Sequence, residues 1–260
     1  MKFKYIFWFF LITLPVCVCS RFLQILFIED PATAFFRPGF ELYGNILSAL
    51  IIIACIGIII LSLACYEKPM RKPKSNIFVA LTSLLLGAGI GYEILTESFT
   101  VKVQVWQITL LDVLGIFSCI FFFLYGIKML IGFPMPKLFA IVPPFYFIMR
   151  LICIFTSISA ISLIVDNVIT LASHCLVLLF MANFAKLLNG IDSDMVFKKI
   201  AASGFTATIL CFVDAIPRLY FLLNKQSGYI HSGVSSPISV LLCGLFILTF
   251  TLCYFKKEKQ

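Results

Sequence analysis

Long apolar runs alternate with short polar segments along the whole chain, and each run has about 20 residues, the length that crosses a bilayer core of about 30 Å as a helix. Backbone groups in lipid must bond within their own segment, so such runs are helices. The sequence does not contain the alternating ten-residue strands that a membrane barrel needs. The pattern therefore predicts an all-α, polytopic helical membrane protein: one transmembrane bundle over residues 1–260, with about eight helices.

The helices are expected at 5–28, 43–65, 76–95, 104–130, 138–164, 167–188, 196–223 and 237–254. The boundary between the fifth and sixth helices rests on length, because 138–188 would form a rod of about 75 Å. Asp166 and Asn167 are N-cap residue types, so the chain is expected to reverse there. Pro143 and Pro144 either kink the fifth helix or mark its first turn.

The first apolar run has two interpretations. Lys2 and Lys4 precede it, and small residues at 17–20 resemble a cleavage site, which would make it a signal peptide and leave seven helices. The run resumes after Arg21, however, and Cys and Val fit a cleavage site poorly. A retained first helix is therefore the preferred interpretation.

Composition and charge agree with a membrane bundle. The chain is 62% hydrophobic with a mean hydropathy of +1.08 and a net charge of +8. The bases lie in short loops on alternate sides of the helices and in no basic and aromatic module, so nucleic acid is not an expected partner. The expected partner is the lipid bilayer. The basic loop 68–74 is interpreted as a topology anchor, with contact to anionic lipids as the alternative.

The bases also predict orientation, because Lys and Arg are enriched in cytoplasmic loops. Most of the Lys and Arg residues in loops lie on one side of the predicted bundle, the side that contains both termini. The opposite side has only Arg37, Lys102 and Lys225. Both termini are therefore expected in the cytoplasm. The bases on the cytoplasmic side are Lys2, Lys4, Lys68, Arg71, Lys72, Lys74, Lys128, Lys137, Lys186, Lys198, Lys199, Lys256, Lys257 and Lys259.

Metal, disulfide and cofactor chemistry find little support in the sequence. The ten cysteines all lie within or at the ends of apolar runs, where Cys acts as a small buried hydrophobe. Cys17 and Cys19 have CxC rather than CxxC spacing, without a nearby His or carboxylate cluster. The acidic segment 192–194 is interpreted as a helix cap rather than as a metal or sugar-nucleotide site. We expect no metal and no cofactor.

Several ionisable residues fall within the predicted helices, where a charge costs about 2.5–3.5 kcal/mol even on lenient insertion scales. Asp214 and Arg218 stand at i, i+4 with the acid first, and Pro217 beside them should kink the helix. The orientation puts most of this set in the outer half of the membrane. The candidate ligand-binding or ion-pair residues are Arg21, Glu93, Asp112, Arg150, His174, Asp214 and Arg218.

Three interpretations of this set stay open. The charges can join helices as ion pairs, form an outward-facing polar pocket, or belong to a proton or ion pathway. The third is the weakest because the inner half has Asn183 as its main deep polar residue. Gly87 and Gly91 form a GxxxG face for close helix packing. The alternative, a phosphate loop, would need a preceding strand.

A weak internal duplication is also visible. Pro15 and Arg21 are six residues apart, as are Pro144 and Arg150, and Asn45 and Asn167 open the second and sixth helices. Two four-helix halves, about 1–130 and 138–260, would put a site on a pseudo-two-fold axis. Matches this sparse arise by chance, so no further expectation depends on them.

Two parts of the sequence resemble a known group of proteins. Residues 21–24 and 29–36 (RFLQ and EDPATAFF), and the later hairpin with Asp166, Asn167 and the segment 184–186, are similar to uncharacterised multi-pass membrane proteins of low-GC Gram-positive bacteria. The resemblance implies a bacterial plasma membrane and a retained first helix. It implies no activity and no functional residue.

Three classes of function follow. The first is a non-enzymatic multi-pass protein whose outward-facing charged pocket binds a small polar ligand or another membrane protein's helix. The second is a small secondary transporter. The third, an intramembrane enzyme, is the least expected because His174 and His231 lie in different segments without a hydrolase or HExxH motif.

Overall fold

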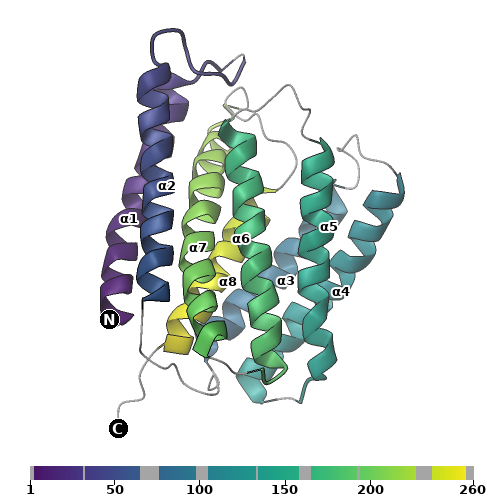
Figure 1. Cartoon of the computed structure of the whole chain (residues 1–260). Helices are drawn as coiled ribbons and strands as arrows, with labels where there is room; N and C mark the ends of the chain where they lie inside the picture. Colours follow the sequence, from purple (N-terminus) through teal and green to yellow (C-terminus); the bar gives the residue numbers. More distant parts are fainter. Residues whose placement is uncertain are drawn as a thin grey trace.

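A computed structural model of the chain describes residues 3–31, 33–64, 76–97, 105–132, 134–157, 165–191, 194–226 and 236–255. Eight helices in these ranges are long and apolar enough to cross a membrane, which confirms the predicted helical class. α1 begins and α8 ends at the same end of the bundle (Figure 1). The helices are α1 (Phe3–Leu23), α2 (Glu41–Leu63), α3 (Ile77–Glu97), α4 (Val105–Ile131), α5 (Val142–Ser157), α6 (Val165–Leu188), α7 (Asp194–Leu223) and α8 (Pro237–Phe255).

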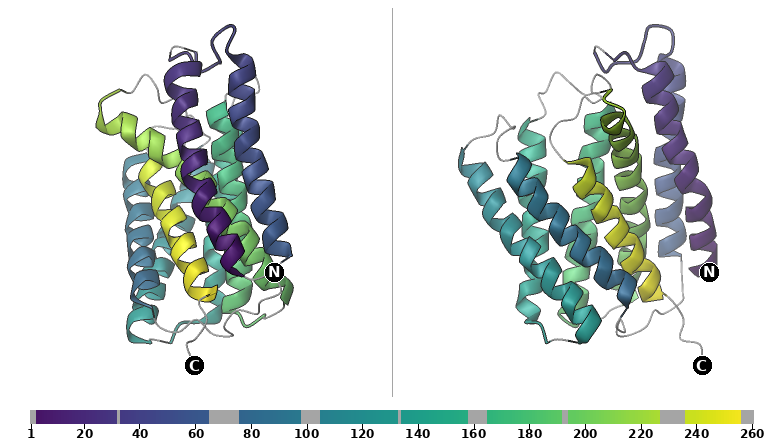
Figure 2. Two further views of the ribbon diagram at one scale, coloured as in Figure 1. Left: turned by 90° about the vertical axis from the view of Figure 1, so that its left-hand side faces the viewer. Right: turned by 180° about the vertical axis from the view of Figure 1, so that it is seen from behind.

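Six of the helices form a closed ring. Each helix from α3 to α8 packs on the next one in the chain, and α8 packs back on α3. The hairpin of α1 and α2 lies outside this ring and packs against α7 (Figures 1 and 2). A π-helical turn, Gln24–Ile28, extends α1, and a 3-10 turn, Lys137–Ile141, precedes α5. The ring and the hairpin therefore meet along α7.

α7 is the most buried helix, although it is the least apolar. Its membrane window is 94% buried with a mean hydropathy of 1.6, whereas that of α2 is 28% buried with a mean hydropathy of 3.1. Apart from Phe205, the residues from Ala201 to Thr208 are small and allow neighbouring helices to approach. Ser203, Thr206 and Thr208 donate hydrogen bonds to carbonyls of their own helix. Lipid selects for apolar side chains on α2, while α7 is shielded from lipid.

An aromatic core fills the half of the ring that is nearer to the end where α1 begins and α8 ends. Phe184 of α6 lies at its centre, with ring centroids 4.9 Å from Phe250 of α8 and 5.3 Å from Tyr125 of α4. Phe122 and Phe246 meet at 5.3 Å beside them. All five side chains are buried. This end of the ring is therefore packed and apolar, as the scarcity of polar residues there predicts.

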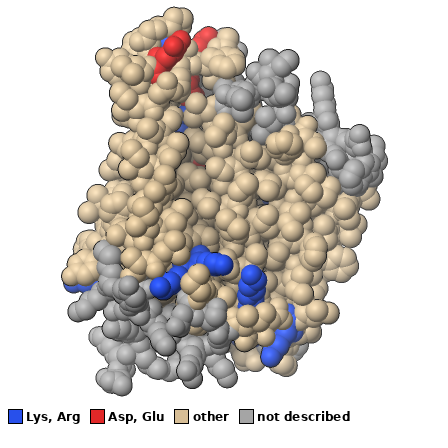
Figure 3. Space-filling model, viewed as in Figure 1, with Lys and Arg blue, Asp and Glu red and all other residues tan. Residues whose placement is uncertain are grey.

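The two ends of the molecule differ in charge. On the face in Figure 3, basic side chains gather at the end where α1 begins, and acidic side chains gather at the opposite end. The sequence-based orientation assigns the basic end to the cytoplasm. We call the basic end inner and the opposite end outer below.

The helix bounds differ from the predicted ones mainly around α5 and α6. α5 begins at Val142, so Pro143 and Pro144 lie in its first turn and do not kink it. α6 begins at Val165, two residues before the predicted start. Asp166 therefore lies inside the first turn, and its carboxylate binds a side chain of α1 instead of capping the helix.

The remaining predictions concern the GxxxG face of α3, the kink at Pro217 and the internal duplication. A Cβ on Gly87 would lie 3.2 Å from the Cys119 carbonyl of α4, and one on Gly91 would lie 3.5 Å from the Cys119 sulfur, so this face of α3 lies close to α4. Pro217 lies within α7, whose outer end leans away from the rest of the helix in the left view of Figure 2. The duplication stays a prediction. The loop 68–74, Asp192, Ser193 and His231 lie outside the described residues.

Candidate functional site

The predicted set of charges separates into two clusters near the outer end of the bundle. Arg21, Asp214 and Arg218 belong to one cluster, where the α1–α2 hairpin meets α6 and α7. Glu93, Arg150 and His174 belong to the other, inside the ring. All six side chains are buried. The structure therefore contains two neighbouring polar clusters rather than one shared pocket.

Arg21 organises the first cluster, which we call the hairpin cluster: Arg21, Gln24, Glu29, Asp166, Thr170, Asp214 and Arg218. The Arg21 guanidinium binds Glu29, with Nη1 2.5 Å from Oε1, and donates its other Nη to Asp166 of α6. Arg21 is only 1% exposed. One cation thus ties the loop after α1 to the start of α6.

The π-helical turn completes this join. Gln24 accepts a hydrogen bond from Arg21 through Oε1 at 3.0 Å, and its Nε2 donates to the Gly44 carbonyl at 2.9 Å and to Ser48 Oγ at 2.8 Å on α2. Burial raises the pKa of Glu29 above its usual value, and the adjacent Arg21 charge opposes that rise.

Asp214 and Arg218 continue the hairpin cluster onto α7. Their side chains lie 3.4 Å apart in the i, i+4 arrangement. Thr170 of α6 donates to Asp214 Oδ1 at 3.0 Å, and Asp166 lies within electrostatic range of Asp214. The hairpin cluster thus combines two arginines with three carboxylates: Glu29 lies in the loop after α1, and the other four residues lie on α1, α6 and α7.

The second cluster, the ring cluster, consists of Glu93, Tyr146, Arg150, Ser239 and the backbone N–H of Ser236. Arg150 of α5 forms a two-pronged ion pair with Glu93 of α3. Tyr146 accepts from Arg150 at 2.8 Å and donates to Glu93 at 3.4 Å. The Ser236 N–H donates to Glu93 at 3.2 Å, and Arg150 donates to Ser239 at 3.3 Å. The pair therefore connects α3, α5 and α8 across the ring.

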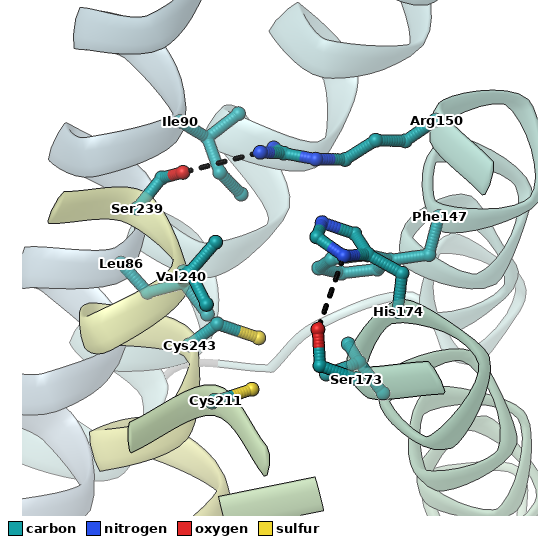
Figure 4. A pocket seen from close by; sticks show the side chains of 11 residues that line it. Leu86, Ile90, Phe147, Arg150, Ser173, His174, Cys211, Ser239, Val240 and Cys243 are labelled. Atoms are coloured by element: carbon teal, nitrogen blue, oxygen red, sulfur yellow. Dashed lines mark hydrogen bonds between the residues drawn. The ribbon is translucent and has the colours of Figure 1, made fainter. Parts of the chain in front are cut away.

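A small cavity lies directly inward of the ring cluster. Its volume is about 10 Å³, close to what one water molecule needs. Figure 4 shows Arg150 and Ser239 at one end and the sulfur atoms of Cys211 and Cys243 at the other. The lining residues, from five of the six ring helices, are Leu86, Ile90, Phe147, Arg150, Ser173, His174, Val177, Cys211, Ser239, Val240 and Cys243.

His174 presents an imidazole nitrogen to this cavity. Its Nδ1 lies 2.8 Å from the Thr170 carbonyl oxygen and 3.3 Å from Ser173 Oγ. A carbonyl oxygen only accepts, so Nδ1 carries the proton in this bond. Nε2 points into the cavity on the side of Arg150 (Figure 4). The cavity thus has a directed polar atom in its wall.

The two clusters meet electrostatically at His174. Arg150 and Glu93 of the ring cluster and Arg218 of the hairpin cluster all lie within electrostatic range of its ring. Asp112 differs from the other candidates: it is half-buried on α4, within electrostatic range of Cys153 of α5, and it does not line the cavity.

Sequence reasoning missed several participants in these clusters. Glu29 and Asp166 were assigned to connections between helices, yet their carboxylates hold Arg21. Tyr146 is one helical turn before Arg150, and that i, i+4 spacing was an available signal. Ser239 and Ser236 had no comparable signal, because their role depends on α8 packing against α3.

The chain was compared with protein-family models, curated proteins and solved structures, and none of them matches it. Within the described residues, no group of three or more His, Cys, Asp or Glu side chains is arranged to hold a metal ion. The fold is that of a multi-pass helical membrane protein, and the two clusters and the cavity are its distinguishing chemistry.

Proposed function

We propose that this membrane protein binds a small polar ligand in the outer half of its six-helix ring and that the ligand enters from the outer face. The observation that carries the proposal is His174 Nε2 pointing into a cavity that the Glu93–Arg150 pair covers. Pockets with a few convergent polar groups in an apolar wall are typical ligand sites. The apolar part of this wall includes Leu86, Ile90 and Val177.

The Glu93–Arg150 pair serves as the outer closure of this pocket. It is formed by two side chains on different helices, so rotamer changes can open it without moving the helices. A cavity of about 10 Å³ admits no ligand larger than water, so binding requires this opening. The ligand and entering water then replace the contacts that the two charges lose.

The pocket wall defines the chemistry of the ligand. His174 Nε2 accepts a hydrogen bond while Nδ1 is protonated, and Arg150 donates hydrogen bonds at the outer end of the cavity. A fitting ligand is therefore a small molecule with at least one donor and one acceptor. Its apolar part would contact Leu86, Ile90 and Val177.

Binding is favoured over transport because the inner half of the ring is closed by the aromatic core. A transporter needs a site that opens to both faces in turn. Opening this ring inward would separate Phe184 from Phe250 and Tyr125, which pack at 4.9 and 5.3 Å. A secondary transporter is the alternative function. We place the protein in a bacterial plasma membrane with both termini in the cytoplasm.

A ligand screen by thermal unfolding tests this proposal. A compound at a hundredfold excess over its Kd is expected to stabilise the protein by about 2.7 kcal/mol. His174→Phe removes Nε2 and fills the cavity, so it is expected to abolish the stabilisation. Asn183→Leu is the control, because Asn183 is a buried polar residue of the same helix away from this cavity. A compound whose effect survives His174→Phe unchanged would contradict the proposed site.

A further inference from the structure

A second cavity opens between α2, α6 and α7, on the outside of the ring. Its volume is about 420 Å³, within the range of ligand sites in proteins, which is about 300–1,000 Å³. Ile59, Leu176 and Leu179 contribute an apolar wall, while Lys186 and Lys199 lie at its basic end. This groove shares no lining residue with the cavity of the ring cluster.

The depth of the lining residues matches one leaflet of a bilayer. Lys186 is two residues from the inner end of α6, about 3 Å along the axis, and Lys199 is five residues from the start of α7, about 7.5 Å. Leu176 is twelve residues from the inner end of α6, or about 18 Å. The groove therefore runs from the headgroup level to the middle of a hydrocarbon core of about 30 Å.

The charges in the groove select an anion. Lys186 and Lys199 are both exposed, and the ion pairs found within the described ranges involve neither of them. None of the lining residues is acidic, so the groove offers no partner for the cationic headgroup of a zwitterionic lipid. Asn183, Ser203 and Thr206 each donate a hydrogen bond to a carbonyl of their own helix, so the two ammonium groups are the charged donors that the groove offers a ligand.

We propose that this groove is a binding site for one acidic phospholipid of the inner leaflet, with its phosphate between Lys186 and Lys199 and an acyl chain along Ile59, Leu176 and Leu179. Basic pockets between helices on the cytoplasmic side bind such headgroups. The site is independent of the proposed ligand pocket, since it lies between α2, α6 and α7, outside the ring, and shares no lining residue with that pocket. It would also hold α2, and with it the α1–α2 hairpin, against the ring.

Native mass spectrometry of the purified protein, titrated with phosphatidylglycerol or phosphatidylcholine, tests this site. The wild type is expected to prefer phosphatidylglycerol. Lys186→Ala/Lys199→Ala is expected to lower that preference about tenfold, because each base near an anionic headgroup adds to the free energy of lipid binding. Unchanged binding of phosphatidylcholine shows that the variant is folded. Lys186→Arg/Lys199→Arg, which keeps both charges, is expected to retain the preference.

Two further variants complete the test. Lys128→Ala/Lys137→Ala removes two bases from the same end of the bundle outside the groove, and it is expected to leave the preference unchanged. Ala202→Trp fills the groove and keeps both lysines, and it is expected to weaken phosphatidylglycerol binding. The proposal is overturned if both alanine pairs lower the preference equally, if neither does, or if Ala202→Trp binds phosphatidylglycerol as the wild type does.

Discussion

Arg21→Met is expected to destabilise the protein by about 3–5 kcal/mol, the range found when one partner of a buried ion pair is removed. Arg21 is 1% exposed and neutralises Glu29 and Asp166, so its loss leaves two buried carboxylates facing each other. The same change disconnects the α1–α2 hairpin from α6. Unfolding by denaturant in detergent micelles measures the difference.

Two controls separate this effect from a general loss of positive charge. Arg37→Ala removes an exposed base in the same loop region, and its effect is expected to stay within about 0.5 kcal/mol. The triple variant Arg21→Met/Glu29→Gln/Asp166→Asn removes the cation together with both anions, so it is expected to recover much of the lost stability. A triple variant as unstable as Arg21→Met would show that the carboxylates are not the cause.

Glu93→Gln is expected to lower the free energy of unfolding by about 3 kcal/mol, because Arg150 is left as a buried charge without its carboxylate. Gln keeps the size of the side chain, so the change isolates the charge of the ring cluster. The expected loss is at the low end of the range because water from the outer face can enter and solvate Arg150. The same denaturant titration measures it.

The matched comparisons are Glu41→Gln and a paired replacement. Glu41 is exposed at the start of α2, and its substitution is expected to change stability by less than about 0.5 kcal/mol. Glu93→Gln/Arg150→Met removes both buried charges and is expected to be more stable than Glu93→Gln alone. If the paired replacement is less stable than the single one, the ion pair is not what makes Glu93 important.

The helices were predictable because lipid imposes the same demand on every spanning segment. Apolar runs long enough to cross a bilayer specify helices whatever their neighbours are, so α2 and α3 begin within two residues of the predicted positions. The start of α6 was less clear, because Asp166 and Asn167 are cap residue types by local preference. The buried Arg21 decides the role of Asp166, and that contact spans 145 residues of sequence.

The depth of the candidate charges was predictable, but their partners were not. Depth depends on the distance to a helix end, which the sequence contains. Partners depend on which helices are neighbours, and the closure of the ring by α8 against α3 leaves no local trace. Asp214 and Arg218 are the exception, since i, i+4 neighbours on one helix meet regardless of the fold. The cavity and the lipid groove are likewise products of packing between helices.

The most direct test of the central claim uses Cys243, whose side chain lines the cavity of the ring cluster. In a protein with Cys243 as its single cysteine, a charged, membrane-impermeant thiol reagent is added to either face of sealed vesicles. Buried thiols react only when water and reagent gain access to them. Cys17, buried on α1 away from the cavity, serves as the single cysteine of the control protein and reports global unfolding.

Glu93→Gln is expected to accelerate labelling of Cys243 from the outer face by about tenfold or more, as local opening of the pocket would. Labelling from the inner face stays slow because the aromatic core is intact, and Cys17 stays protected in the same background. Equal acceleration at Cys17, acceleration from the inner face, or none at all would contradict an outward-facing pocket closed by Glu93 and Arg150.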